Sequence, residues 1–232
     1  MEQKTLTIRN MAVQVLKKDI KNIHLSVLPP DGRVRVSVPR YVQDETIRLF
    51  IIKKLPWIKK HIANFQAQAR QSERQYISGE SHYFKGQRYI LRVEKANRPR
   101  IEIRNKKYIY LFVPEHYDTR QKRNYYENWL RKNLREDLKR LMPKWEKKIN
   151  VQVNEVKIKK MKTRWGTCNP EKKRIWINLE LAKKPEKHLE YIIVHELVHL
   201  LEKKHNDRFK KLMDDFMLGW EHIRRDLNDF VL

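Results

Sequence analysis

The stretch YIIVHELVHLL, residues 191–201, contains the pattern HExxH within an apolar run. Histidines four residues apart lie on the same face of an α-helix, so the imidazoles of His195 and His199 can bind one metal ion. Glu196 then lies beside the ion and can accept a proton from a bound water. Zinc takes neutral imidazole ligands, and a catalytic zinc keeps one position open for water. The stretch therefore predicts the metal-binding helix of a zinc hydrolase.

We expect this helix to span residues 186–203. Pro185 and Glu186 are suited to its first turn, and Lys203 with Lys204 to its end. Because the pattern is short, a helix that carries two surface histidines is the structural alternative to a metal site. A third ligand decides between the two interpretations.

The candidate third ligand is His205, six residues after His199. In a continuous helix six residues turn by about 600° and rise by about 9 Å, so His205 would leave the face of His199. The helix must therefore end near residues 203–204, and Asn206 can cap a new helix from about Asp207. This spacing equals that of the metzincin pattern HExxHxxGxxH. Where that pattern has its glycine, this chain has Glu202. The competing third ligands are the carboxylates that follow: Asp214, Asp215 and Glu221.

Four segments carry a resemblance to a known family: TRWGTC (163–168), RIWINL (174–179), YIIVHELVHL (191–200) and HNDRF (205–209). Together they resemble the YgjP-like metallopeptidases, predicted metal-dependent hydrolases that are similar to the SprT-like zinc proteases. The chain departs from the family pattern at Thr167, where the family commonly has serine. We do not expect this difference to change the chemistry.

The resemblance implies one zinc ion per chain, with His195, His199 and His205 as ligands and Glu196 as the catalytic carboxylate. It also implies an α+β fold with a zincin-like core, in which a sheet packs against the HExxH helix. Peptidases of this layout commonly hold an extended peptide against an edge strand. We expect residues 174–179 to form that strand.

The expected organisation is a β-rich N-terminal region, 1–115, followed by a catalytic region, 116–232, with one integrated domain as the alternative. Residues 22–38 predict a hairpin, and a helix near 44–71 should break or kink at Pro56. A second long helix is expected over about 119–148. Further strands are expected near residue 83 and over about 88–94, 100–104, 107–113, 151–159, 162–168 and 174–178.

The composition is strongly basic: 53 Lys and Arg against 28 Asp and Glu give a net charge of +25. Such a charge favours polyanionic partners such as DNA, although a solvated basic surface explains it equally well. Residues 157–174 hold eight basic residues and one acid just before the metal helix. We therefore expect nucleic-acid contacts near the active site from four lysines: Lys157, Lys159, Lys160 and Lys162.

The single cysteine, Cys168, cannot form an internal disulfide, which fits a reducing compartment. We interpret it as a packed structural thiol. The sequence has no apolar run long enough to span a membrane, and the first residues lack the apolar core of a signal peptide. We expect a cytoplasmic protein without membrane association.

Three residues near the motif have competing interpretations. Arg164 could bind a substrate carboxylate or polarise a carbonyl, or it could hold its loop to the helix. Tyr191, one turn before His195, could donate to an oxyanion, although a packed tyrosine is the more ordinary role. His188 lies about 10 Å before His195 along the helix, too far to share the ion, and we expect it at the surface. The remaining histidines, at positions 24, 61, 82, 116 and 222, lack ligand spacing.

The sequence thus predicts a zinc-dependent metallopeptidase that acts on peptides or proteins, with nucleic-acid-associated proteins as one expected substrate class. Two other classes remain open: a nucleic-acid-binding protein with a structural or vestigial zinc site, and an amidohydrolase of non-peptide substrates. The number of protein ligands distinguishes the metallopeptidase from the nucleic-acid-binding protein with a structural zinc site. Three ligands leave a position for water, whereas four close the site.

Overall fold

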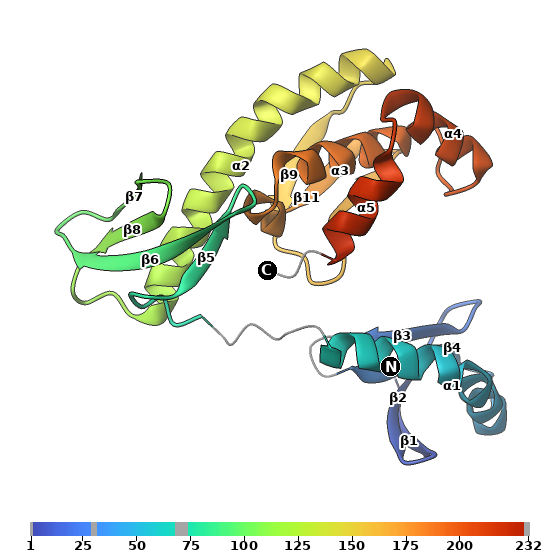
Figure 1. The fold of residues 1–232 in the computed structure, drawn as a ribbon. Helices are drawn as coiled ribbons and strands as arrows, with labels where there is room; N and C mark the ends of the chain where they lie inside the picture. Colours follow the sequence, from blue (N-terminus) through green and yellow to red (C-terminus); the bar gives the residue numbers. More distant parts are fainter. Residues whose placement is uncertain (1, 29–31, 68–73, 230–232) are drawn as a thin grey trace. The chain divides into compact units, whose positions relative to one another are not determined.

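The computed structural model describes residues 2–28, 32–67 and 74–229 (Figure 1). Contacts divide the chain into two compact units, Met1–Gln71 and Ser72–Leu232. Each unit has a hydrophobic core of its own. We describe the two units separately.

Unit 1 is a four-stranded sheet with one helix. The strand order is β1 (Glu2–Ile8), β2 (Met11–Lys18), β4 (Arg33–Pro39) and β3 (His24–Leu28), in which only β2 and β4 run parallel. Alternate valines of β2 and β4 belong to one core with isoleucines four and seven residues apart on α1 (Asp44–Ala67). Side chains alternate along a strand and recur about every helical turn, so each set lies on one face of its element. The core is formed by Val13, Val15, Val34, Val36, Ile47, Ile51 and Ile58.

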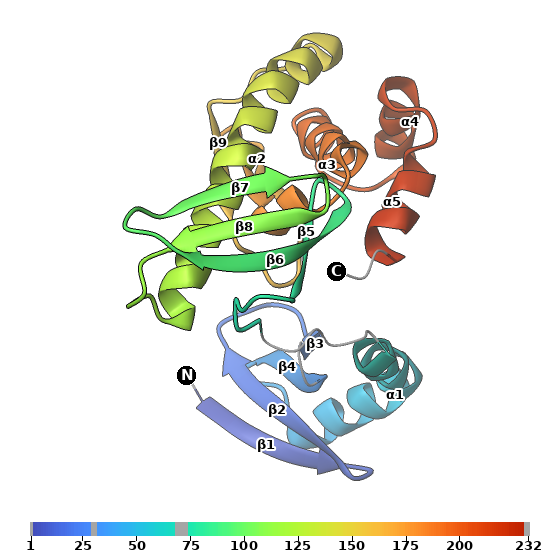
Figure 2. The same ribbon diagram turned by 60° about the vertical axis from the view of Figure 1, so that its left-hand side comes forward.

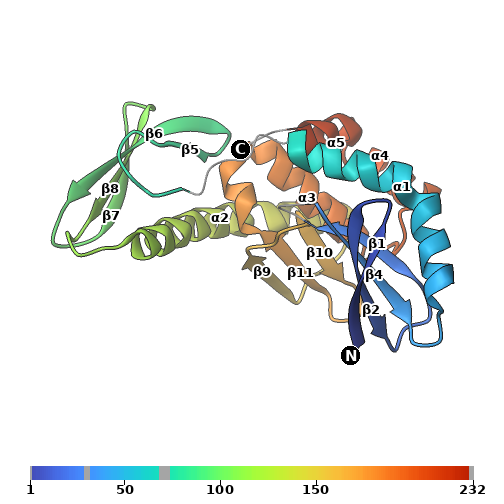
Figure 3. The same ribbon diagram turned by 90° about the horizontal axis from the view of Figure 1, so that it is seen from below.

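The predicted elements of unit 1 are largely found, with differences at their ends. β3 and β4 pair antiparallel as the expected hairpin, whose tip at 29–31 lies outside the described residues. Of the break or kink expected near Pro56, the break does not form, since α1 continues through this residue. The helix bends along its length, as the kink alternative predicts (Figure 3). The part of the expected helix beyond residue 67 lies outside the described residues.

The first half of unit 2 is a second four-stranded sheet on a long helix. Its order is β5 (Ser81–Phe84), β6 (Gln87–Lys95), β8 (Tyr108–Val113) and β7 (Arg100–Arg104). The helix α2 (Thr119–Ile149) begins at a capping box and lies behind this sheet in Figure 2. Apolar residues at helical spacing on α2 belong to the same core as the inward residues of the sheet. From α2 these are Tyr126, Leu130, Leu134, Leu138 and Leu141, and from the strands Leu91, Ile109 and Leu111.

The observed division of the chain differs from the boundary expected at 115/116. That position lies between β8 and α2, whose side chains share one core with the HExxH helix. The inward residues of the sheet and of α2 are buried in this one core, so the two belong to the same unit. The contacts instead divide the chain between Gln71 and Ser72.

A small three-stranded sheet lies before the metal helix. Its order is β10 (Gly166–Asn169), β11 (Arg174–Asn178) and β9 (Glu155–Lys159), with β10 antiparallel and β9 parallel to β11. The strands expected from residues 151 and 162 therefore begin at 155 and 166. β11 is paired on both sides, so the prediction that residues 174–179 form the edge strand is wrong. Its buried Ile175 and Ile177 place it in the middle of the sheet, and β10 is an edge.

The helix with the HExxH pattern is the centre of unit 2. After the 3₁₀ turn η1 (Leu179–Lys183), α3 (Glu186–Val198) contacts α2, β10, β11 and two later helices (Figure 1). These are α4 (Asp207–Phe216) and α5 (Trp220–Asp229). α3 is apolar on nearly every side because partners surround it.

The predicted fold class is confirmed: an α+β protein in which a sheet packs against the HExxH helix. Among the described residues, no helix is long and apolar enough to cross a membrane.

Candidate metal centre

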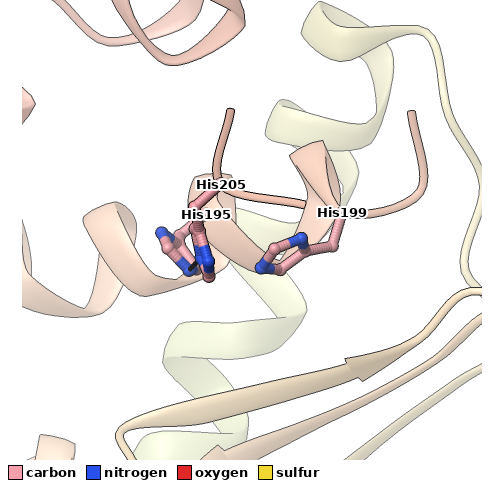
Figure 4. A group of neighbouring side chains, drawn as sticks. All are labelled: His195, His199 and His205. Carbon is pink, nitrogen blue, oxygen red and sulfur yellow. Dashed lines mark hydrogen bonds between the residues drawn. The ribbon is translucent and has the colours of Figure 1, made fainter. Parts of the chain in front are cut away.

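Three histidines converge at the C-terminal end of α3 (Figure 4). One ring nitrogen from each of His195, His199 and His205 lies within 4.8 Å of the others. The Nε2 atoms of His195 and His205 are 3.0 Å apart. Tetrahedral zinc with bonds of about 2.0–2.1 Å separates its ligand atoms by roughly 3.3 Å. The three imidazoles are therefore positioned to bind a single ion.

The chain reverses after α3 so that His205 can reach the other two histidines. α3 ends at Val198, earlier than expected, and the carbonyl oxygen of Val198 accepts hydrogen bonds from the amides of Leu201 and Glu202, both at 2.9 Å. Asn206 then caps α4 by accepting from the amide of Phe209, as its sequence position predicts. Glu202 is not among the residues with positive φ, so this turn does not need the metzincin glycine.

Burial favours the neutral form of His195 and His199, which is the form that binds a metal. Burial lowers the pKa of His195 to about 3, with further contributions from His199 and His205. Burial also lowers the pKa of His199, whose Nδ1 lies 3.1 Å from the carbonyl oxygen of Glu202. A carbonyl can only accept, so Nδ1 carries the proton and Nε2 keeps its lone pair for a metal. The donor set therefore fits a zinc ion.

Phe209 is the side chain that supports the three imidazoles. It is buried, and its ring centroid lies 5.0, 4.8 and 4.7 Å from those of His195, His199 and His205. This packing limits the rotation of each ring. Sequence reasoning did not assign Phe209 a role. Its one signal is an apolar side chain on the first turn of the helix that follows His205.

Glu196 is buried beside the histidines, where burial raises its pKa to about 8 and the charge of Arg164 acts in the opposite direction. A bound cation would lower this pKa again, because an opposite charge favours the carboxylate. The strand β10 approaches Glu196 so closely that a Cβ atom on Gly166 would lie 2.5 Å from Oε1. Gly166 is therefore part of the site, although its only sequence signal is a glycine within a strand.

A cavity of about 550 Å³ contains the histidines and Glu196. The edge strand β10 forms one wall. Cys168 lies on this wall, but burial and the nearby Glu196 raise the pKa of its thiol to about 12, so it is not a thiolate. This agrees with a structural thiol. Thr167 and Asn169 of β10 also line the cavity, together with Pro170 and Glu171 of the β10–β11 turn, and with Arg164 and Lys203.

The two expected substrate contacts differ in position. Arg164 is among the cavity-lining residues, its charge acts on Glu196, and its backbone oxygen accepts a hydrogen bond from Asn178. Tyr191 is buried and is not among the cavity-lining residues. Its ring stacks on Trp220, with centroids 6.3 Å apart, and meets the ring of His195 edge-on. Burial raises the pKa of Tyr191 to about 12. A contact of its hydroxyl with an oxyanion stays a prediction.

His188 is buried, and the expectation that it lies at the surface is wrong. Its Nε2 is 3.2 Å from a carboxylate oxygen of Asp226, so it ties α3 to α5. The sequence could not reveal this interaction, because α5 covers that face of α3 from nearly forty residues further along the chain.

The competing ligands and the four lysines lie outside the histidine cluster. Among the described residues, the group that could hold a metal contains neither Asp214, Asp215 nor Glu221. Of the lysines, Lys157 pairs with Glu155 and Lys160 with Glu127, while Lys159 lies over the ring of Trp176. Ion pairs neutralise part of this basic segment. The nucleic-acid contacts expected there stay a prediction.

The family assignment follows from a sequence comparison. The model of the YgjP-like metallopeptidase domain matches residues 21–230. The chain belongs to the YgjP-like metallopeptidase family. The YgjP-like domain is therefore a metal-dependent hydrolase of the peptidase type, and the predicted resemblance is confirmed. The match includes most of both units.

Two solved structures are similar to part of this YgjP-like chain. The zymogen of the metallopeptidase abylysin from Pyrococcus abyssi is 19% identical, with a TM-score of 0.36, over 40% of this chain and 94% of its own. The zymogen of the metallopeptidase jannalysin from Methanocaldococcus jannaschii is 22% identical, with a TM-score of 0.36, over 39% of this chain and 93% of its own. A search of curated protein sequences gave no match.

The close approach at Gly166 gives a testable prediction. In Gly166→Ala, the new Cβ would lie 2.5 Å from Oε1 of Glu196 and 2.8 Å from Cγ2 of Ile192. We expect overpacking to cost about 1–3 kcal/mol of unfolding free energy. We also expect lower turnover per folded molecule, because the carboxylate is displaced. Thermal unfolding and peptide hydrolysis measure the two effects.

Gly79→Ala is the control for this prediction. Its φ of +97° strains any side chain, but no atom lies within 4 Å of the new Cβ. This variant should lose stability while keeping its turnover per folded molecule. Equal turnover in the two glycine variants would show that Gly166 does not position Glu196.

Proposed function

We propose that this protein is a zinc-dependent peptidase whose general base is Glu196. The observation that carries the proposal is the arrangement of one cavity: three imidazoles, a buried carboxylate next to them and a wall formed by β10, one edge of which no other described strand occupies. Three histidines leave one coordination position for water, as catalytic zinc sites require. The site residues His195, His199, His205 and Glu196 are proposed in these roles.

Each part of the cavity has a chemical task. The carboxylate of Glu196 takes a proton from the attacking water and passes it to the leaving amine nitrogen. Arg164 lines the same cavity, and its positive charge would favour negative charge on the substrate. When bound at the histidines, zinc would polarise the scissile carbonyl and lower the pKa of a bound water.

The edge strand β10 is proposed to position the substrate. All four of its residues line the cavity, and β11 occupies only one of its edges. An extended peptide can pair with the other edge through main-chain hydrogen bonds. Such pairing depends little on side chains, so a broad range of peptide sequences is expected to bind.

The proposal is tested with a library of quenched fluorescent peptides. We expect hydrolysis by the zinc-loaded protein, loss of hydrolysis after chelation and recovery on adding zinc. Glu196→Gln, purified in the same way, controls for contaminating proteases. If peptides stay intact while small amides are cleaved, the protein is an amidohydrolase of non-peptide substrates. If zinc binds without any hydrolysis, the metal site is structural.

A further inference from the structure

The sheet β5-β6-β8-β7 has a face that the core of unit 2 does not use. On β8, Ile109 and Leu111 point inward and are buried, so Tyr108 and Tyr110, with Phe112, belong to the opposite face. In Figure 2 the strands β6, β8 and β7 lie in front of α2, which packs on the inward side. The outward face is accessible: the side chains of Arg100 and Arg104 are 52% and 48% exposed.

The three aromatic rings form a continuous row along β8. The rings of Tyr108 and Tyr110 meet edge-on with centroids 6.3 Å apart, and those of Tyr110 and Phe112 stack at 6.0 Å and 19°. Residues two apart on one strand repeat at about 6.6–6.8 Å, which is close to twice the spacing of stacked bases in nucleic acid. Tyr108 and Tyr110 are partly exposed, whereas Phe112 is buried at 9% exposure and Arg100 lies over its ring. The row therefore offers two stacking positions in sequence, at the tyrosines.

Arginines from both neighbouring strands lie over these rings. From β7, the guanidinium of Arg100 is 3.7 Å from the centroid of Phe112, and that of Arg104 is 4.5 Å from Tyr110. From β6, the guanidinium of Arg92 is 5.3 Å from Tyr108. We call these six residues the aromatic–arginine face: Arg92, Arg100, Arg104, Tyr108, Tyr110 and Phe112.

The aromatic–arginine face is positively charged. Glu102 lies between Arg100 and Arg104 and bonds to both, so one carboxylate is shared by two cations. Glu94 of β6 lies opposite Phe112 in the pairing of β6 with β8, so this second acid belongs to the same face. Lys107, just before β8, adds a cation over the ring of Tyr108. The pKa of Tyr108 is lowered, first by its hydrogen bond with Lys107, which agrees with this positive potential.

We propose that the aromatic–arginine face binds single-stranded nucleic acid. Exposed bases stack on tyrosine rings and guanidinium planes, and the arginines neutralise the phosphates between them. A duplex keeps its bases paired and unavailable for such stacking. An acidic peptide satisfies the charge but has no row of flat rings to place over the aromatics.

This inference does not depend on the peptidase proposal. The face lies on the sheet of β5–β8, whereas the metal cavity is formed by β10, α3 and the loop to α4. It also differs from the lysines at 157–162, which lie on and beside β9. Binding at the aromatic–arginine face can therefore be measured with the catalytic residues unchanged.

The test is fluorescence anisotropy of a labelled oligothymidylate with the full chain across salt concentrations. In Tyr108→Ala/Tyr110→Ala, we expect affinity to fall at least about fivefold for each base that can no longer stack, with the salt dependence unchanged. In Arg92→Ala/Arg104→Ala, the slope of log affinity against log salt should flatten by about 0.7 for each phosphate that is no longer neutralised. The two variants thus separate stacking from charge.

Two further variants keep the result interpretable. Tyr108→Phe/Tyr110→Phe retains the rings and should bind as the wild type, which excludes a general loss of folding. Lys132→Ala/Arg135→Ala removes two exposed cations from α2 and should leave the affinity within about twofold of the wild type. The proposal is overturned if oligothymidylate does not bind at low salt, if the double alanine variant of the tyrosines binds normally, or if duplex DNA binds more tightly than the single strand.

Discussion

Glu196→Gln is expected to lower peptide hydrolysis by at least about a hundredfold while zinc binding and thermal stability stay close to wild type. A positioned acid–base group contributes roughly 10² to 10⁴ in rate. Glutamine has the shape of glutamate, so the close packing against Gly166 is preserved. It cannot accept a proton from water and return it to the leaving amine. The measurement is kcat/KM on a cleaved peptide, together with metal content.

The matched control is Glu190→Gln on the same helix. The carboxylate of Glu190 accepts hydrogen bonds from Lys144 at 2.9 Å and from Trp145 at 3.3 Å, on the side that faces α2. It does not line the metal cavity. We expect this variant to keep its activity. Wild-type turnover in Glu196→Gln would exclude Glu196 as the general base.

The sequence predicted the parts of the site that depend on local spacing. Two histidines one turn apart on α3 require only helical geometry. The reversal before His205 followed from the impossibility of a continuous helix, and Asn206 is the cap that the sequence suggested. These inferences concern residues within a few positions of one another. The structure places all three histidines together.

The sequence failed where a distant partner decides the outcome. His188 is buried because α5 packs over α3, and no pattern near His188 indicates that packing. β11 and β10 both alternate as strands, but only the pairing of β11 with β9 shows which of them is the edge. The expected boundary at 115/116 rests on local pattern in the same way. A change from strands to helix at residue 116 suggests a domain boundary, whereas the shared core of β8 and α2 excludes one.

Gly166 and Phe209 show a different limit. Each carries out its role through close packing: Gly166 by having no side chain against Glu196, and Phe209 by lying behind three imidazoles. Neither residue has chemistry that identifies it in a sequence. Both residues lie within the segments that carry the family resemblance. That resemblance is the feature of the sequence that indicates their importance.

The metal site gives the second large expected effect. We expect the wild type to bind one zinc per chain, and His195→Ala, His199→Ala and His205→Ala each to weaken binding by more than about a hundredfold. Loss of an outer-shell partner of a metal ligand already lowers metal affinity about 10- to 100-fold. Loss of a ligand removes a bond to the ion itself. His205 is the most informative position because its side chain is exposed, so alanine there should not unfold the protein.

Asp214→Ala, Asp215→Ala and Glu221→Ala are the controls, since these carboxylates were the competing ligands and lie outside the histidine group. Zinc binding is measured in two ways. Mass spectrometry gives the zinc content, and thermal unfolding gives the rise in Tm on adding zinc, because a ligand that binds only the folded state stabilises it. Tm should rise for the wild type and the carboxylate variants and stay constant for His205→Ala. If His205→Ala keeps its zinc while Asp215→Ala or Glu221→Ala loses it, then a carboxylate completes the site. The turn after α3 would then serve only to connect two helices.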